Sequence, residues 1–262
     1  MRRASCAWRA AAVLFATALA GSGSDAGSAD ARRSGSAYMT PEVRAMQQDD
    51  GLNPAMLWVQ DGAAAWSRKP AAGERSCADC HGDASSSMRG VAARYPRFDA
   101  ASGRPLTLGE RIDACVVRHQ HGAPLGAEHE ARLALEAYVG LQSRGLPIAP
   151  DADARLEPFA AAGARLYTQR MGQLDFSCAQ CHDERAGLRL GGSTIPEAHP
   201  TGYPIYRLEW QTLGSLQRRL RGCMSGVRAE PFAYGSRELV ELEIYLARRA
   251  AGLAVETPAV RP

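Results

Sequence analysis

Two stretches of the chain decide its fold, Cys77-Ala-Asp-Cys80-His81 and Cys178-Ala-Gln-Cys181-His182. Both have the C-x-x-C-H spacing, in which two cysteines one helical turn apart bond to one haem and the following histidine ligates its iron. A zinc knuckle would need a fourth ligand at each motif, and a thioredoxin-like pair needs no following histidine. The motifs therefore predict two covalently bound haem c groups per chain, attached through Cys77, Cys80, Cys178 and Cys181, with His81 and His182 as proximal ligands.

The first twenty residues have the pattern of a removable leader. Met1–Arg9 is basic, Ala10–Ala20 is apolar, and the small residues that end this run offer a cleavage site. The apolar run is too short to span a bilayer. We expect residues 1–20 to be a signal peptide, residues 21–38 to be a disordered mature N-terminus, and the mature protein to be periplasmic with no membrane span.

The charge balance of the chain excludes one class of function. The 262 residues include 31 basic and 28 acidic side chains, and Arg2, Arg3 and Arg9 belong to the predicted leader. Without these three arginines the charge is close to zero. A protein that coats nucleic acid carries a strong basic excess, so no nucleic-acid partner is expected.

An internal repeat surrounds the two motifs. The same features recur in the same order, at one constant offset up to the motifs and at a slightly larger offset beyond them. This arrangement indicates a duplicated haem domain with a small insertion in the second copy. The matched pairs are Gly62-x-x-x-Trp66 with Gly163-x-x-x-Tyr167, Arg111–Cys115 with Arg219–Cys223, Glu136-Ala-Tyr138 with Glu243-Ile-Tyr245, and Gly145-Leu146 with Gly252-Leu253.

Helical patterns dominate both copies. Thr40-Pro41 reads as an N-cap before a first-turn proline, and Thr107-x-x-Glu110 reads as a capping box. Leu133–Ser143 and Leu239–Ala250 each carry an apolar stripe and stop near a glycine, whereas no run alternates convincingly as a strand. We predict a mainly α fold of two tandem cytochrome c-like helical domains, residues 39–148 and 149–262, joined at the Pro-rich segment Leu146–Asp151.

Two cysteines of the mature chain lie outside the motifs. Cys115 and Cys223 follow His81 and His182 at comparable distances along the chain, in the region from which class I-like cytochromes c supply the distal ligand. They could pair with each other, remain free or ligate the two irons. Methionine is the commoner ligand, but the repeat favours cysteine because the rival side chains have no counterpart in the other copy. These rivals are Met224, His119 and His121. Met88 is a further rival, but it follows His81 by only seven residues. His129 and His199 also lack counterparts and are expected to be ordinary surface or core histidines.

An arginine stands one helical turn before each of these cysteines, Arg111 before Cys115 and Arg219 before Cys223. Residues at this spacing share a helix face, and a nearby guanidinium favours the thiolate, which is the nucleophilic and metal-binding form. Only the second cysteine has further arginines close by in sequence. We therefore predict an anion site at Cys223 that suits a small sulfur oxyanion. The additional arginines are Arg218, Arg221 and Arg228.

From about Thr40 to Leu253 the sequence resembles the SoxA family, the dihaem subunits of the SoxAX cytochromes of bacterial thiosulfate oxidation. The resemblance depends on longer stretches than the haem motifs alone. The most specific stretches are Asn53-Pro-Ala-Met-Leu-Trp58, Ser76-Cys-Ala-Asp-Cys-His-Gly82, Met88-Arg-Gly-Val-Ala-Ala-Arg94, Tyr206-Arg-Leu-Glu-Trp210 and Arg218-Arg-Leu-Arg-Gly-Cys-Met-Ser-Gly-Val-Arg-Ala-Glu-Pro231.

The resemblance implies an activity and a set of roles. SoxA-like proteins pair with the small monohaem cytochrome SoxX and oxidatively join thiosulfate to a cysteine of the carrier SoxYZ, the reaction of an L-cysteine S-thiosulfotransferase. By resemblance, Cys223 is the catalytic distal ligand of the active haem, as a persulfide, with His182 as the proximal ligand. Arg219 then faces the substrate as a catalytic residue, and His81 and Cys115 are the axial pair of the first haem.

Two other functions remain open at this point. A plain dihaem electron carrier would need no arginine cluster and would more often have methionine or histidine as distal ligands. A dihaem peroxidase would need an open or releasable distal position at one iron. Reduction of haem by thiosulfate in the presence of the carrier would separate the three functions.

Overall fold

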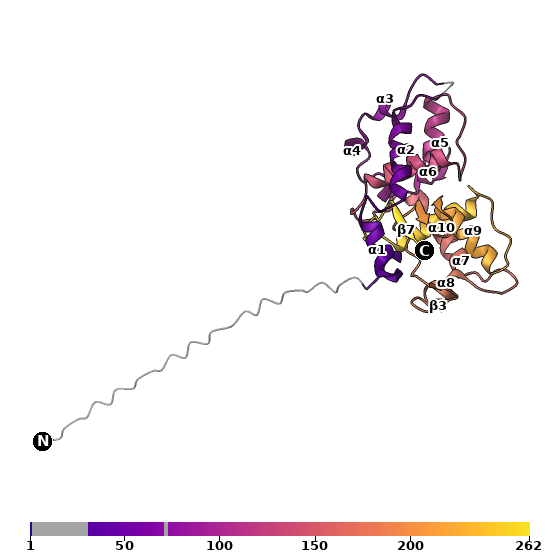
Figure 1. The fold of residues 1–262 in the computed structure, drawn as a ribbon. Coiled ribbons are helices and arrows are strands. Elements are labelled where there is room, and N and C mark those ends of the chain that lie inside the picture. The colour runs from indigo at the N-terminus through magenta and orange to yellow at the C-terminus, as the bar shows by residue number, and fades with distance from the viewer. Residues whose placement is uncertain (2–30, 71–72) are drawn as a thin grey trace. The chain divides into compact units, whose positions relative to one another are not determined.

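Helices build both repeats of the chain, as the computed structural model shows (Figure 1). The structure describes residues 1, 31–70 and 73–262, and residues 32–262 form one compact unit. Apart from Met1, the predicted signal peptide lies outside the described residues. Within the described part of the chain, no helix has both the length and the apolar character needed to cross a bilayer.

The elements of the first repeat surround its haem motif. In chain order they are η1 (Gly35–Tyr38), α1 (Pro41–Gln48), α2 (Ala55–Ser67), α3 (Cys77–His81), α4 (Ala84–Ser87), η2 (Ala92–Arg94), β1 (Arg97–Asp99), β2 (Arg104–Leu106), α5 (Leu108–His119) and α6 (Glu130–Leu141). The second repeat follows the same plan. Its elements are η3 (Ala154–Leu156), α7 (Glu157–Thr168), α8 (Cys178–His182), β3 (Arg189–Leu190), β4 (Ser193–Thr194), β5 (Ile205–Arg207), β6 (Thr212–Gly214), α9 (Leu216–Gly226), α10 (Arg237–Arg249) and β7 (Ala259–Arg261).

One helix pair forms the scaffold of each repeat, α2 with α6 and α7 with α10. A Cβ atom on Gly62 would lie 2.1 Å from the carbonyl oxygen of Ala134, and one on Gly163 would lie 2.0 Å from that of Glu241. Both glycines therefore let two helix backbones touch. Ala134 and Glu241 stand at equivalent positions of the repeat, so the same helix crossing occurs twice and the predicted duplication is confirmed.

The predicted helix boundaries are confirmed at several points. The Thr40 hydroxyl accepts a hydrogen bond from the Val43 amide at the start of α1, and Thr107 and Glu110 form the capping box of α5. Helices α6 and α10 lie where the apolar stripes predicted them. The glycines that follow them, Gly145 and Gly252, have φ values of 80° and 87°, which favour glycine.

The structure contains short strands, although no run of the sequence alternates convincingly as a strand. The antiparallel pairs β1–β2 and β5–β6 occupy equivalent positions in the two repeats, and β7 adds to β5 in parallel, giving the order β6-β5-β7. Such very short strands cannot display alternating hydrophobicity, which is why the sequence pattern does not reveal them.

An apolar cluster connects the two repeats. Val59 of α2 and Leu133 of α6 pack with Tyr206, Leu213 and Val260 of the three-stranded sheet. The sheet of the second repeat thus lies against the helix pair of the first repeat. The predicted division between residues 148 and 149 stays a prediction.

Part of the predicted linker Leu146–Asp151 pairs through its backbone with the end of the second repeat. Pro147 and Ala254 form an antiparallel bridge, flanked by backbone hydrogen bonds from Ile148 N to Leu253 O and from Val255 N to Leu146 O. Pro147 and Ala254 are themselves equivalent positions of the repeat. The junction is therefore an antiparallel pairing of one segment with its own copy, the arrangement expected at a two-fold axis.

The predicted disorder of residues 21–38 does not extend to residues 31–38. Ser34 and Ser36 both donate hydrogen bonds of 2.6 Å to the Glu256 carboxylate, and Tyr38 donates one of 2.8 Å to Glu197. These contacts hold η1 against the second repeat. Residues 21–30 lie outside the described part of the chain.

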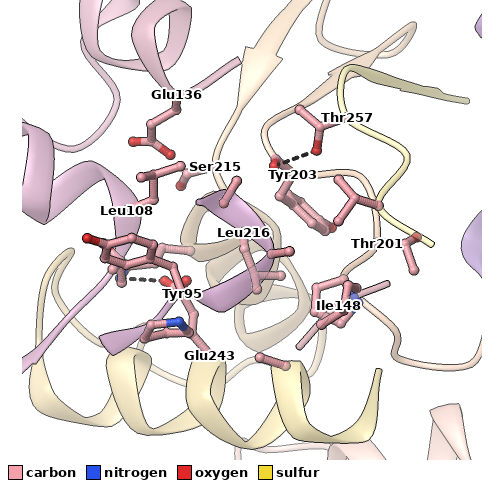
Figure 2. Close-up of a pocket in the computed structure, with 18 of the residues that line it drawn as sticks. Tyr95, Leu108, Glu136, Ile148, Thr201, Tyr203, Ser215, Leu216, Glu243 and Thr257 are labelled. Atoms are coloured by element: carbon pink, nitrogen blue, oxygen red, sulfur yellow. Dashed lines mark hydrogen bonds between the residues drawn. The ribbon is translucent and has the colours of Figure 1, made fainter. Parts of the chain in front are cut away.

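A pocket with a cavity of about 120 Å³ lies between the repeats (Figure 2). Glu136 enters it from α6 and Glu243 from α10, the two positions that the repeat makes equivalent. Arg132 donates to Glu136 over 3.0 Å, whereas Gln217 donates to Glu243 over 2.8 Å. The pocket is lined by neither haem motif, so its carboxylates are separate from the chemistry of the cysteines.

Candidate functional site

The two haem motifs form short helices with the same N-terminal cap. Ser76 and Asp79 make a reciprocal capping box at α3, and Ser177 and Gln180 make one at α8. The cap starts each helix directly before its first cysteine. The two cysteines of each motif therefore lie on one face of a helical turn, as attachment to one haem requires.

An aromatic side chain fixes the end of each motif. Trp66 of α2 donates its indole N–H to the Gly82 carbonyl over 2.9 Å, and Tyr167 of α7 donates its hydroxyl to Asp183 over 2.9 Å. Gly82 and Asp183 directly follow the two motif histidines. The Gly-x-x-x-aromatic pattern that identifies the repeat thus has a function in each copy, because the glycine permits the helix crossing and the aromatic residue anchors the motif.

In the second repeat, His182 has its two ring nitrogens in different environments. Nδ1 lies 2.7 Å from the Pro196 carbonyl oxygen, to which it donates in the neutral ring, so Nε2 carries the lone pair. Burial acts to lower the pKa of His182, but the hydrogen bonds with Cys223 of α9 and with Pro196 outweigh it and raise that pKa. The proximal histidine and the spare cysteine predicted from the sequence are thus together.

The Cys223 thiol lies in a positive environment. Burial opposes ionisation of this thiol, but a hydrogen bond with His182 and the charges of Arg219 and Arg207 lower its pKa below the usual value. Arg219 lies one helical turn before Cys223 on α9, as predicted. Arg207 comes from β5 and was not among the predicted site residues.

The other predicted arginines have different surroundings. The guanidinium of Arg218 lies 4.2 Å from the centre of the Trp210 ring. Arg221 donates to the backbone carbonyls of Pro231 and Phe232, and Arg228 is exposed with a φ of 59°. Of the four arginines predicted near the sulfur, Arg219 is the one whose charge is among the main causes of the lowered pKa of Cys223.

In the first repeat, Cys115 and the motif cysteines are electrostatic neighbours. Burial raises the pKa of Cys115, and this effect outweighs the charges of Arg111 and Arg118. Asp99 of β1 contributes to the difference from Cys223, because its carboxylate pairs with both arginines, at 2.9 Å from Arg111 and 2.8 Å from Arg118. The two spare cysteines thus have equivalent positions and opposite pKa shifts.

The rival side chains have other surroundings, and both spare cysteines are free thiols. Met224 is buried in the apolar core of the second repeat, and Met88 packs in that of the first. His129 caps α6 by accepting from the Ala131 amide, and His199 contacts the Arg33 carbonyl at 2.8 Å. His119 and His121 are exposed. His129 is thus a helix cap and His199 is a buried histidine bonded to the backbone, which agrees with ordinary surface and core histidines.

The residues present fit a covalently bound haem. In the second repeat, a cysteine pair on one helical turn, a histidine whose Nε2 bears the lone pair and a cysteine facing it provide the attachment atoms and both axial donors. Apolar side chains surround the motifs, with Trp66, Val91 and Leu125 near Cys77 and with Tyr167 and Leu242 near Cys178. Such side chains offer the macrocycle an apolar contact surface, which haem binding requires.

Comparison with known proteins places the chain in a family. The family model of the SoxA/TsdA cytochrome c domain matches twice, over residues 61–148 and 162–255. The curated SoxA subunit of L-cysteine S-thiosulfotransferase from Pseudaminobacter salicylatoxidans is 38% identical, over 87% of this chain and 80% of that protein. The corresponding subunit from Rhodovulum sulfidophilum is 36% identical, over 88% of this chain and 81% of that protein.

A solved structure agrees with the sequence comparisons. A chain of the SoxXA crystal structure from P. pantotrophus superposes with a TM-score of 0.83 at 33% identity, covering 88% of this chain and 87% of that one. The fold is thus the mainly helical, twice-repeated cytochrome c fold that the sequence predicts. The matched repeats, together with identities of 38% and 36% over most of each relative, show that the chain belongs to the SoxA family of c-type cytochromes.

Proposed function

We propose that the chain is the dihaem SoxA subunit of an L-cysteine S-thiosulfotransferase. One observation carries this proposal: His182 of α8 and Arg219 of α9 are both neighbours of the Cys223 sulfur, and both lower the pKa of its thiol. An electron carrier needs two axial ligands but no arginine at the distal sulfur. The charge at Cys223 therefore favours a site that binds an anion over one that only carries electrons.

Two haem c groups are proposed per chain. Cys77 and Cys80 would attach the first and Cys178 and Cys181 the second, with His81 and His182 as proximal ligands and Cys115 and Cys223 as distal ligands. When bound, the haem would accept electrons one at a time, so the two electrons of the reaction would leave in succession. The His182 Nδ1–H donates to the Pro196 carbonyl, which keeps Nε2 basic and directed to its ligand position.

The proposed reaction balances in atoms and charge. Thiosulfate and the thiol of a carrier cysteine give a cysteine S-thiosulfonate, one proton and two electrons, with a new sulfur–sulfur bond. Cys223 would meet the outer sulfur of thiosulfate, as a persulfide by resemblance to the family. Thiosulfate is a dianion, and a thiolate or persulfide anion at Cys223 would repel it, so Arg219 would offset this repulsion as the two approach.

The proposed partners and location come from the resemblance. The matched crystal structure is of a SoxXA assembly, which supports a SoxX-like monohaem cytochrome as partner and electron acceptor. A SoxYZ-like carrier would bring the acceptor cysteine. The basic and apolar leader of residues 1–20 supports export to the periplasm, where covalent haem c is attached.

The test is reduction of haem in the mature protein, assayed with SoxX, carrier and thiosulfate added singly and together. We expect haem reduction that requires both thiosulfate and the carrier thiol. The carrier should gain the mass of one thiosulfate group and lose that of one thiol hydrogen. Reduction by a general electron donor alone, with no carrier adduct, would mark a plain electron carrier. Turnover of hydrogen peroxide without adduct formation would mark a peroxidase.

A further inference from the structure

The hairpins β1–β2 and β5–β6 place Asp99 and Arg207 at the same position of the repeat. Asp99 pairs with Arg104 in the first hairpin, and Arg207 pairs with Thr212 in the second. Each residue ends the first strand of its hairpin, and the offset between them is the one that relates Arg111 to Arg219. A carboxylate in one repeat therefore corresponds to a guanidinium in the other.

In the first repeat, this carboxylate neutralises the arginine next to the cysteine. Asp99 is 4% exposed, and it accepts hydrogen bonds from Arg111 at 2.9 Å and from Arg118 at 2.8 and 3.2 Å. The hydrogen bonds from Arg118 and Ser102, with the charge of Arg111, hold the pKa of Asp99 far below its usual range. Arg111 thus has an anion supplied by its own chain.

In the second repeat, the corresponding anion is missing from the described part of the chain. Arg207 is 9% exposed, and its Nη2 donates to Glu209, a side chain that is 65% exposed. Its buried Nε has no hydrogen-bond partner among the described residues. Arg219 and Cys223 are among its charged neighbours, so two guanidinium groups approach one sulfur without the acid that the first repeat provides.

The same reversal of charge extends along the helix that carries the cysteine. Glu110 and Asp113 of α5 correspond to Arg218 and Arg221 of α9, at the same offset as the two spare cysteines. Gly226 takes the position of Arg118, and no atom lies within 4 Å of the Cβ that it lacks. Compared with α5, α9 therefore carries arginines in place of two acids, and it has open space at Gly226, one helical turn after Cys223.

We propose that Arg207 is a second substrate-binding residue, and that an oxyanion group of thiosulfate binds between Arg207 and Arg219 as the counter-ion that Asp99 provides for Arg111 in the first repeat. This inference rests on the proposed function. A sulfonate group has three acceptor oxygens, enough to bond to both guanidinium groups at once while the outer sulfur is left for Cys223. Arg207 comes from a strand and Arg219 from a helix, so the two approach the anion from different directions.

The experiment measures thiosulfate binding and turnover separately. In the mature dihaem protein with SoxX, Arg207→Gln should raise the dissociation constant of thiosulfate, titrated calorimetrically without carrier, by about 10- to 150-fold. KM should rise with it while kcat changes less. Arg207→Asp should abolish measurable binding, because the new carboxylate would pair with Arg219 as Asp99 pairs with Arg111. Arg207→Lys should recover part of the affinity.

Controls separate this site from the general function and from the haem. Arg97→Gln removes an exposed arginine of the equivalent strand β1 and should leave binding unchanged. If wild-type protein binds thiosulfate but forms no carrier adduct, the proposed function fails and the oxyanion site stands. The site is wrong if Arg207→Gln binds thiosulfate normally. A shift in the midpoint potential of the second haem with normal binding would assign Arg207 to a haem propionate instead.

Discussion

Glu136 and Glu243 stand at equivalent positions of α6 and α10, and their carboxylates line the same pocket between the two repeats. Burial raises the pKa of Glu136 to about 7 and that of Glu243 to about 8. The charge of Arg132 lowers the pKa of Glu136 and offsets part of the effect of burial. The charge of Glu136 adds to the shift of Glu243, so the junction resists carrying two negative charges.

This relationship predicts how stability depends on pH. Between the ordinary carboxyl pKa and pH 8, the folded protein holds more protons at this pair than the unfolded chain does. The free energy of unfolding should therefore fall as the pH rises, by up to about 1.4 kcal/mol per unit for one carboxyl. Glu243→Gln should flatten this dependence in urea unfolding between pH 5.5 and pH 8. An equal slope in Glu243→Gln and wild type would contradict it, and Glu230→Gln, at an exposed position, is the control.

The helix crossings predict a matched pair of packing variants. Gly62→Ala and Gly163→Ala would each put a methyl group within about 2 Å of a carbonyl oxygen of the partner helix, so each should lower the free energy of unfolding by about 1–3 kcal/mol. Gly222→Ala, at an open position of α9, should be neutral or stabilising by up to about 1 kcal/mol. Urea denaturation measures the free energy of unfolding of all three variants. Equal values would show that the helix pairs accommodate the added methyl groups without cost and would contradict the prediction.

The number of haem groups is checked by intact mass. Mature wild-type protein should exceed its polypeptide mass by two haem groups. Cys77→Ala should weaken attachment at the first motif and Cys178→Ala at the second, each without affecting the other, because the motifs lie on separate helices. A wild-type mass with one haem would show that one motif is vestigial.

Distal ligation by Cys115 and Cys223 predicts a low-spin, thiolate-type spectrum for both haem groups. Electron paramagnetic resonance of the oxidised protein should show two such species, and Cys115→Ala and Cys223→Ala should each remove one. The far-red charge-transfer band of methionine-ligated haem should be absent. Its presence in wild type would assign Met88 or Met224 to that iron.

The two arginines that precede the spare cysteines should differ in their effect on turnover. Arg219→Ala should lower turnover by about 10- to 150-fold, since among the described residues no acid competes for its guanidinium in the way Asp99 does for Arg111. Arg111→Ala should stay within a few-fold of wild type and change mainly the first haem's potential or the stability of the first repeat. Steady-state rates with thiosulfate, carrier and SoxX decide between them. Equal losses in both variants would place the active site elsewhere.

Local patterns in the sequence were sufficient for much of the fold. The C-x-x-C-H motifs, the caps at Thr40 and Thr107 and the duplicated Gly-x-x-x-aromatic pattern each depend on near neighbours in the chain. These features have the same geometry wherever they occur. The strands were missed because they are too short to form a pattern, and the engagement of Leu146–Asp151 was missed because its partners belong to the far end of the second repeat.

The surroundings of Cys223 show a second limit of prediction. Proximity in sequence indicated Arg218 and Arg221, but one side chain stacks on Trp210 and the other bonds to backbone carbonyls. Arg207 lies well before the cysteine on another element, and only the fold brings it near. The signal that could have found it was the repeat itself, because aligning the two copies sets Arg207 against Asp99.

The self-pairing of Pro147 with Ala254 has a consequence for the history of the chain. Two copies of a single-repeat ancestor could form this junction as a homodimer, with both partners encoded by one gene. In such a dimer every substitution occurs twice, so an aspartate at position 99 of one copy excludes an arginine at the same position of the other. Fusion of the genes removes that constraint. One copy can then keep an aspartate that neutralises the arginine beside its cysteine, while the other copy carries an arginine at that position and can bind an external anion.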